Sequence, residues 1–194
     1  ILDLSIKNSI NKVIFSSSIY AISSNGGFYR CSKRACEDFF EEYSKKYNLK
    51  FSILRYGSLY GPNSDETNGI YKILKDAVKK RKLEYIGNKK AQRRYIHVKD
   101  AAKLSVKVLE RKIDEKAISI FGQKPVSVDQ LFDLMFEISG KRKKVKYLNK
   151  INADDHYGYS PYRFIPENSI KLSSDTSIDL GEGLLRLFNY NEKK

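Results

Sequence analysis

The chain has 194 residues, of which 37 are Lys or Arg and 23 are Asp or Glu, so its formal net charge is +14. A hydrophobic fraction of 41% is enough to build a core, which excludes an intrinsically disordered chain. No apolar run approaches the roughly 18 residues of a membrane-spanning helix, so no membrane partner is expected. Two cysteines, Cys31 and Cys36, form neither a disulfide framework nor a metal cluster, and they favour a reducing, cytoplasmic setting.

The predicted elements alternate between strands and helices along the chain. Short β-branched and aromatic runs predict strands, whereas apolar residues at helical spacing predict helices. We expect strands at 12–16, 51–54, 83–86, 95–98, 117–121 and 145–148, helices at 29–47, 70–80, 100–111, 127–139 and 183–188, and a loop at 152–166. Strands joined through helices by short connections predict an α/β fold with a parallel sheet covered by helices.

The clearest helix boundaries lie on either side of the segment 128–139. Ser127 is a preferred N-cap residue, and Gln130 three positions later completes a capping box. Gly140 follows the last apolar residue of the pattern, where a glycine commonly ends a helix. The sequence therefore predicts a helix that starts after Ser127 and stops before Gly140.

Polar residues follow two of the predicted strands at the point where each strand ends. The serines at 16–18 end the first strand, and the segment 56–58 ends the second. In parallel α/β sheets, ligands bind in the crevice beyond the carboxyl ends of the strands. We therefore expect these two segments to line one crevice.

Tyr29 and Lys33 form a Tyr-x-x-x-Lys pair at the start of a predicted helix, where residues four apart share a face. An ammonium beside a phenol favours the phenolate, so the pair can act as a base on a substrate hydroxyl that Ser18 hydrogen-bonds. The spacing alone is a weak signal in a Lys-rich chain with 14 tyrosines, and an isolated pair is usually a surface contact. The same spacing recurs at Tyr71/Lys75, Tyr85/Lys89, Tyr95/Lys99 and Tyr190/Lys194. Only the pair at Tyr29 and Lys33 opens a helix shortly after a buried strand that ends in serines.

Four segments in order then resemble a known family. The sequence reads VIFSSSIYA, YRCSK, ILRYGSLYGP and RRYIHVKDAA, and this series is similar to the extended short-chain dehydrogenase/reductase family of nucleotide-sugar epimerases and dehydratases. The resemblance runs from about residue 11 to 122 and continues more weakly to the C-terminus. It implies a Rossmann NAD(P)-binding domain, here 1–62 and 93–122, and a smaller C-terminal substrate domain, here 63–92 and 123–194.

The resemblance also implies roles for particular residues. It implies a catalytic set of Ser18, Tyr29 and Lys33, with cofactor contacts from Ser16, Tyr29, Lys33, Tyr56 and Gly57, and substrate contacts from Ser58, Asn68 and Arg93. Arg163 is a further candidate for a substrate phosphate, and the fork of Arg93 suits the diphosphate because it donates two hydrogen bonds. The implied cofactor is NAD, with NADP as the alternative, the implied substrate is a nucleotide sugar, and the implied assembly is a homodimer. The implied reaction begins with hydride transfer from a sugar carbon and passes through a keto sugar.

The sequence departs from this family in three ways. No glycine-rich phosphate loop opens a first βα unit, so we expect roughly the first hundred residues of the Rossmann domain to be absent and this polypeptide alone to bind NAD poorly. Ser18 and Tyr29 are 11 positions apart, a short interval for the family. Ile19 and Tyr20 stand where 4,6-dehydratases have an acidic pair and UDP-glucuronate decarboxylases have a glutamate. Without that acid, epimerisation or keto-sugar reduction is favoured over loss of water.

The resulting hypothesis is a fragment of a nucleotide-sugar epimerase-like enzyme. The alternatives are a 4-keto-sugar reductase of the same family, a basic nucleic-acid-binding module, and an inactive remnant that serves as an interaction surface. The positive charge is dispersed except for the run 141–144, and no zinc-finger or RNP-type pattern accompanies it. Nucleic acid is therefore the less favoured partner.

Overall fold

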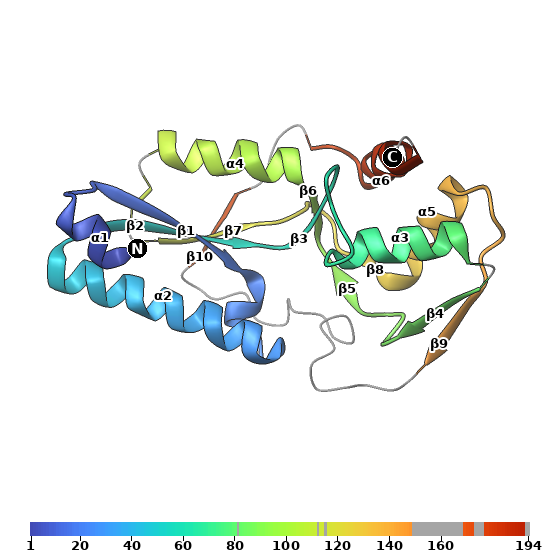
Figure 1. The fold of residues 1–194 in the computed structure, drawn as a ribbon, viewed down its shortest axis with the longest axis horizontal. Helices are drawn as coiled ribbons and strands as arrows, with labels where there is room; N and C mark the ends of the chain where they lie inside the picture. The colour runs from blue at the N-terminus through green and yellow to red at the C-terminus, as the bar shows by residue number, and fades with distance from the viewer. Residues whose placement is uncertain (81, 112, 115, 149–168, 173–176, 193–194) are drawn as a thin grey trace.

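The computed structural model describes residues 1–80, 82–111, 113–114, 116–148, 169–172 and 177–192 (Figure 1). The predicted loop at 152–166 and the candidate Arg163 lie outside these ranges. The described part is a mixed α/β structure with a parallel main sheet, which confirms the predicted fold class.

The main sheet is built from four parallel strands in the order β1-β2-β7-β10. These are β1 (Lys12–Ser18), β2 (Lys50–Tyr56), β7 (Lys116–Ile120) and β10 (Ser169–Leu172). β1 and β2 run in a register that pairs Ser17 with Arg55 and Ser18 with Tyr56. Their carboxyl ends, which carry the predicted polar segments, therefore lie side by side.

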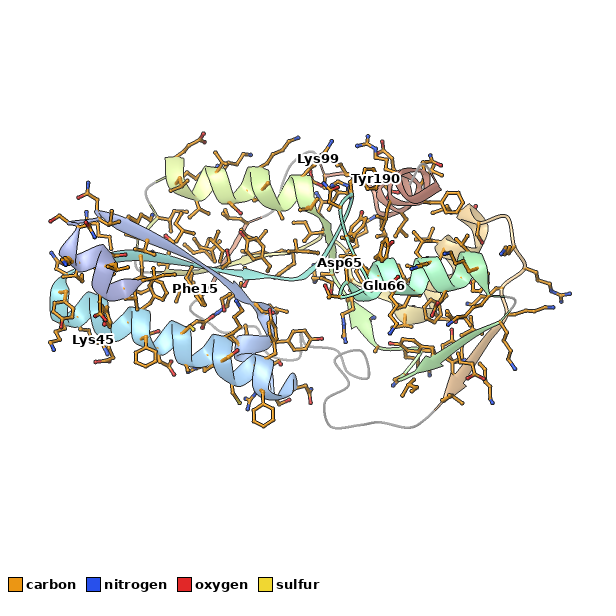
Figure 2. All side chains as sticks on the ribbon, viewed as in Figure 1. Phe15, Lys45, Asp65, Glu66, Lys99 and Tyr190 are labelled. Atoms are coloured by element: carbon orange, nitrogen blue, oxygen red, sulfur yellow. The ribbon has the colours of Figure 1, made fainter. Side chains whose placement is uncertain are left out.

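One helix covers each face of this sheet (Figure 1). α2 (Gly27–Tyr47) packs on one face, where Phe40 contacts Phe51 and Ile53, and α1 (Leu2–Lys7) lies against α2. α4 (Val98–Glu110) packs on the other face against the apolar residues Leu54, Ile118 and Ile120. Figure 2 shows Phe15 in the layer between β1 and α2, where its ring stacks on Phe40 with centroids 5.1 Å apart. Because successive strand residues point to opposite faces, both faces are apolar and both need a helix.

A second apolar cluster lies away from the main sheet. It joins the helices α3 (Gly69–Lys79), α5 (Val128–Ile138) and α6 (Leu180–Glu192), with the fully buried Phe132 at its centre. Three two-stranded sheets border it: β3 (Ser58–Tyr60) with β6 (Tyr95–His97), β4 (Leu83–Ile86) with β9 (Val145–Leu148), and β5 (Gln92–Arg93) with β8 (Val126–Ser127). The division into domains at 62/63 and 92/93 stays a prediction.

Most predicted boundaries hold within a few residues, and the caps explain why. Both hydrogen bonds of the capping box between Ser127 and Gln130 are present. At the other end, α5 ends at Ile138, Ser139 is its C-cap residue, and Gly140 follows with φ +65°. The helix predicted at 183–188 is longer in the structure and begins at Leu180. Within the described ranges, every helix is too short or too polar to cross a lipid bilayer.

Candidate active site

A cavity of about 590 Å³ opens at the carboxyl ends of β1 and β2. Ligand pockets commonly enclose about 300–1,000 Å³, so this one has room for a sugar and the end of a cofactor. Eight of the ten predicted site residues line it: Ser16, Ser18, Tyr29, Lys33, Tyr56, Gly57, Ser58 and Asn68. The topology therefore brings together the two polar segments that the sequence placed in one crevice, and it adds the starts of α2 and α3.

Ser18 ends β1 and leads into a short 3-10 helix, η1 (Ile19–Ile22). Its hydroxyl oxygen caps this helix by accepting a hydrogen bond of 3.3 Å from the backbone N–H of Tyr20. Because a hydroxyl has one proton and two acceptor lone pairs, the Ser18 proton can still be donated to a substrate oxygen. Ser18 is almost fully buried at the floor of the cavity, with 7% of its surface exposed.

Tyr29 and Lys33 lie in the first two turns of α2. This helix begins where the backbone at Gly26 passes close to the side chain of Tyr20. Gly26 adopts φ +119°, and a Cβ at this position would lie 2.9 Å from the ring of Tyr20, so only glycine fits without a shift. The rings of Tyr20 and Tyr29 meet edge to face with centroids 6.4 Å apart. Tyr29 keeps 45% of its surface exposed, which is compatible with access from a ligand.

The ammonium of Lys33 is hydrogen-bonded to the backbone of β1, the strand that carries Ser16 to Ser18. Its Nζ donates a 2.8 Å hydrogen bond to the carbonyl oxygen of Ser16, and it lies 5.9 Å from the centroid of the Tyr29 ring. An ammonium has three N–H donors, so donors remain for a ligand hydroxyl after the bond to Ser16. Ser18, Tyr29 and Lys33 thus face one cavity from two different elements, β1 and α2.

The end of β2 and the residues after it also line the cavity. The hydroxyl of Tyr56 shares a 2.6 Å hydrogen bond with the hydroxyl of Ser105 on α4, so this ring is fixed toward the α4 face. The backbone N–H of Gly57 donates a 2.9 Å bond to the carbonyl of Ile120 on β7. Ser58 then begins β3 and lines the cavity.

Asn68 lies where the cavity meets α3, and its side chain has a structural role. Its Oδ1 accepts a 3.1 Å hydrogen bond from the backbone N–H of Tyr71, which caps α3, and its Nδ2 donates a 3.0 Å bond to the carbonyl of Leu59. A contact between Asn68 and a nucleotide diphosphate stays a prediction.

Arg93 lies on β5 and is fully buried, with 0% of its surface exposed. Arg93 is therefore not a surface cation, although most Lys and Arg side chains lie at protein surfaces. Arg93 is not among the residues that line the cavity of Ser18 and Tyr29, and its Nη1 donates to the carbonyl of Gln92 at 3.1 Å. His97 on β6 is 1% exposed, and its Nδ1 caps α4 by accepting a hydrogen bond from the backbone N–H of Lys99. Burial lowers the pKa of His97, so its neutral form is favoured.

An ion pair between Glu37 on α2 and Arg55 on β2 lies close to the cavity and is not among the residues predicted from the sequence. Their closest approach is 2.7 Å, and their side chains are 2% and 11% exposed. The spacing of the sequence could have indicated Glu37. Tyr29, Lys33 and Glu37 follow one another at intervals of four residues, which places Glu37 on the same side of the helix as the two predicted site residues.

The described cavity lining contains no aspartate or glutamate. Among the described residues, no group of three or more His, Cys, Asp or Glu side chains is arranged to hold a metal ion. The polar groups that the described lining offers are hydroxyls, one ammonium, an amide and backbone groups. This donor set suits hydroxyl-bearing ligands.

Comparison with known proteins gives the site a context. A model of the NAD dependent epimerase/dehydratase family matches residues 1–120. The chain is 25% identical over 166 residues to a UDP-glucuronate 4-epimerase of Thermodesulfobacterium geofontis, a match that covers 85% of this chain and 50% of that protein. It is 26% identical over 207 residues to a putative UDP-glucose 4-epimerase of Methanocaldococcus jannaschii, covering 98% of this chain and 66% of that protein. The chain thus spans 50% to 66% of the length of these two relatives.

Solved structures share the fold. The chain superimposes with a TM-score of 0.75 on UDP-glucose 4-epimerase of Thermotoga maritima in complex with UDP-glucose, at 24% identity, covering 99% of this chain and 67% of that one. It superimposes with a TM-score of 0.81 on a mutant UDP-glucuronic acid 4-epimerase of Bacillus cereus bound to a fluorinated UDP-sugar and NAD, at 18% identity, covering 99% and 65%. At these identities the likeness establishes the fold alone.

Proposed function

Because the chain belongs to the NAD dependent epimerase/dehydratase family, we propose that it forms part of a nucleotide-sugar 4-epimerase-like enzyme. In this enzyme Ser18, Tyr29 and Lys33 form the catalytic set. The observation that carries the proposal is the single cavity that these three side chains line from β1 and α2. The names of the two curated relatives, both UDP-sugar 4-epimerases, support the reaction type.

The proposed role of these residues is to move one proton at a sugar hydroxyl. Ser18 donates a hydrogen bond to the hydroxyl oxygen and holds it in place, and the Tyr29 phenolate accepts the hydroxyl proton. The ammonium of Lys33 stabilises the negative charge of the phenolate by Coulomb attraction. Loss of the proton and of the hydride on the same carbon turns the alcohol into a ketone. Return of the hydride to the opposite face of that carbon, and of the proton to its oxygen, restores the alcohol with inverted configuration.

The residues present fit one end of the implied cofactor. The ammonium of Lys33 can donate to a ribose hydroxyl and the phenolate oxygen of Tyr29 can accept from one, and Ser16, Tyr56 and Gly57 line the same cavity. NAD⁺, when bound, supplies the acceptor for the hydride that leaves the sugar carbon. The sequence contains no glycine-rich loop for the pyrophosphate, so we expect the described residues to hold only the nicotinamide end.

The cavity chemistry favours epimerisation over dehydration. Loss of water from a sugar needs an acid and a base at neighbouring carbons, in addition to the group that takes the hydroxyl proton. No carboxylate lines the described cavity, and η1 carries Ile19 and Tyr20 at the positions where dehydratases of this family have acids. The proposed product therefore keeps all of its oxygen atoms.

The test is an assay for inversion at C4 in the full-length protein. UDP-glucose and UDP-glucuronic acid are incubated separately with the protein and NAD⁺, and the sugar is followed by proton NMR. We expect the 4-epimer to appear without net consumption of NAD⁺. A 4-keto-sugar reductase would instead leave both sugars unchanged and, when given a 4-keto nucleotide sugar and NADPH, would consume NADPH in proportion to product. Absence of both reactions, together with nucleic-acid binding that weakens steeply with salt, would favour the basic binding module and refute the proposal.

A further inference from the structure

Two buried side chains and a largely buried one form a hydrogen-bonded group next to the cavity: Ser17 on β1, Glu37 on α2 and Arg55 on β2. We call this group the Ser17–Glu37–Arg55 network. The hydroxyl of Ser17 donates a 2.5 Å hydrogen bond to Oε1 of Glu37. Arg55 donates to the same carboxylate from Nε at 3.0 Å to Oε1 and from Nη2 at 2.7 Å to Oε2. Only 4% of Ser17 and 2% of Glu37 is exposed, so this charged carboxylate is held almost entirely by the other two residues.

The hydrogen bonds of the network can form only in the observed register of β1 and β2, whose ends line the cavity. Ser17 and Arg55 are direct partners in the parallel pairing of β1 and β2, and both face α2. The next pair in the register is Ser18 with Tyr56, and the hydroxyl of Tyr56 bonds to α4 on the opposite face. A slip of one residue would exchange the two faces, so Glu37 would lose both partners. One carboxylate thus ties the strand ends that carry Ser18 and Tyr56 to each other.

The same carboxylate fixes the position of α2 along the strands. Glu37 lies four residues after Lys33 and eight after Tyr29. With a rise of about 1.5 Å per residue, these residues lie about 6 Å and 12 Å along the helix from Glu37, on neighbouring parts of one face. Any movement of Glu37 along the sheet therefore moves Tyr29 and Lys33 relative to Ser18.

Apolar packing alone does not provide this precision. α2 packs on the sheet through Phe40, Phe51 and Ile53, and such contacts are non-directional. A charge-assisted, bidentate contact between Arg55 and Glu37 is directional, because the guanidinium presents its donors in a fixed fork. A buried ion pair is weak evidence for stability, since an apolar pair of similar volume often stabilises a fold equally well. Its directionality is the property that an apolar pair cannot reproduce.

We propose that the Ser17–Glu37–Arg55 network positions the catalytic set, and that Glu37 and Arg55 are positioning residues for the reaction. The inference rests on the proposed function. Of the three residues only Ser17 lines the cavity, so Glu37 and Arg55 act through the placement of Ser18, Tyr29 and Lys33. A misplacement of about 1 Å can lower a rate by about 100-fold, so a network remote from the substrate can control turnover.

The test replaces the ion pair without leaving a buried charge. In the full-length protein, the double variant Glu37→Leu/Arg55→Met keeps volume and removes both charges, so we expect it to fold with an unfolding midpoint close to that of the wild type. We expect kcat for inversion of UDP-glucose at C4 to fall about 10- to 100-fold, while KM changes less than about twofold. The matched control is Asp38→Asn, which breaks the neighbouring pair of Arg34 and Asp38, whose side chains are 57% and 58% exposed. We expect this control to leave kcat and KM unchanged.

A smaller perturbation keeps the proposal testable if the double variant does not fold. Ser17→Ala removes one hydrogen bond to Glu37, and we expect kcat to fall about tenfold with KM unchanged, a tenfold loss corresponding to about 1.4 kcal/mol. Ser17→Thr keeps the hydroxyl and should restore most of kcat. A stable double variant with wild-type kcat, or a Ser17→Ala variant with wild-type kcat, would overturn the positioning role and leave the proposed function intact. A wild-type protein without C4 inversion would overturn both.

Discussion

Replacement of Tyr29 by phenylalanine isolates the one atom that the proposed chemistry requires. The variant loses only the phenolic oxygen and keeps the ring that lies 6.4 Å from Tyr20 in an edge-to-face contact. Because 45% of Tyr29 is exposed at the cavity, we expect the free energy of unfolding to change by less than about 0.5 kcal/mol. Proton transfer by a positioned side chain contributes about 10²- to 10⁴-fold to a rate. The expected loss of kcat therefore corresponds to about 3–5 kcal/mol of activation free energy.

The chain offers a matched control on the same helix. Tyr47 is also 45% exposed and ends α2, at the opposite end of the helix from the cavity. Tyr47→Phe removes the same atom from an equally exposed phenol, so we expect full activity and a similarly small change in stability. The comparison separates loss of a phenol on α2 from loss of the phenol in the cavity.

The assay measures C4 inversion of UDP-glucose by NMR in the full-length protein, with urea unfolding and calorimetric NAD⁺ binding as parallel measurements. We expect Tyr29→Phe to bind NAD⁺ with nearly unchanged affinity and to lose turnover. If Tyr29→Phe retains more than about one tenth of wild-type kcat, then Tyr29 is not the base and the assignment of the catalytic set is wrong.

Three further predictions concern Asn68, which lines the cavity, and Arg93 and His97, which do not. Arg93→Ala should raise KM for a UDP-sugar by about tenfold or more, because a charge-assisted contact to phosphate is lost; an unchanged KM in steady-state kinetics would exclude that contact. Asn68→Ala should lower the free energy of unfolding by about 1 kcal/mol through loss of the α3 cap, and Asn68→Ser, which offers a cap oxygen without a second oxygen toward the Leu59 carbonyl, should lose less; equal urea midpoints for the wild type and Asn68→Ala would contradict this. Burial lowers the pKa of His97 below its ordinary value of 6.5, so its contribution to stability is complete above that value and is lost as the pH falls below it. The wild type should therefore lose more stability than His97→Gln between pH 7 and pH 5, and equal losses would show that protonation of His97 does not contribute.

Three of the four strands of the main sheet could be predicted from the sequence because their signals are local, whereas β10 (Ser169–Leu172) is not among the predicted strands. The run from Lys12 to Ser16 is β-branched and aromatic, and the structure extends it to Ser18 as β1. The helix that follows Ser127 has a complete capping box in both sequence and structure. In both segments, the sequence pattern that predicts the strand or helix lies within that strand or helix or at its ends.

The two-residue strands β5 and β8 could not be predicted because distant partners stabilise them. β5 and β8 have two residues each and exist through their pairing, in which Gln92 lies opposite Ser127 and Arg93 opposite Val126. Two residues carry no periodicity, so a sequence pattern cannot detect them. The burial of Arg93 has the same origin, since a guanidinium in a Lys-rich chain is expected at the surface unless its neighbours enclose it.

The site was predictable in part. The serines of β1 and the pair of Tyr29 and Lys33 were identified because strand ends and helix starts meet at one edge of a parallel sheet. The ion pair of Glu37 and Arg55 was missed, because a charged residue on a helix is usually solvated and nothing local marks Glu37 as buried. Its partner lies 18 residues away on a neighbouring strand, so the contact depends on tertiary structure.

The most direct test of the proposed reaction follows the hydrogen at C4. UDP-glucose that carries deuterium at C4 is converted by the full-length protein with NAD⁺ in ordinary water, and the product is examined by NMR. The proposed mechanism predicts that the 4-epimer retains deuterium at C4 and that turnover is slower than with the unlabelled sugar. A 4-epimer that has exchanged this deuterium for solvent hydrogen would contradict the proposed route through a keto sugar.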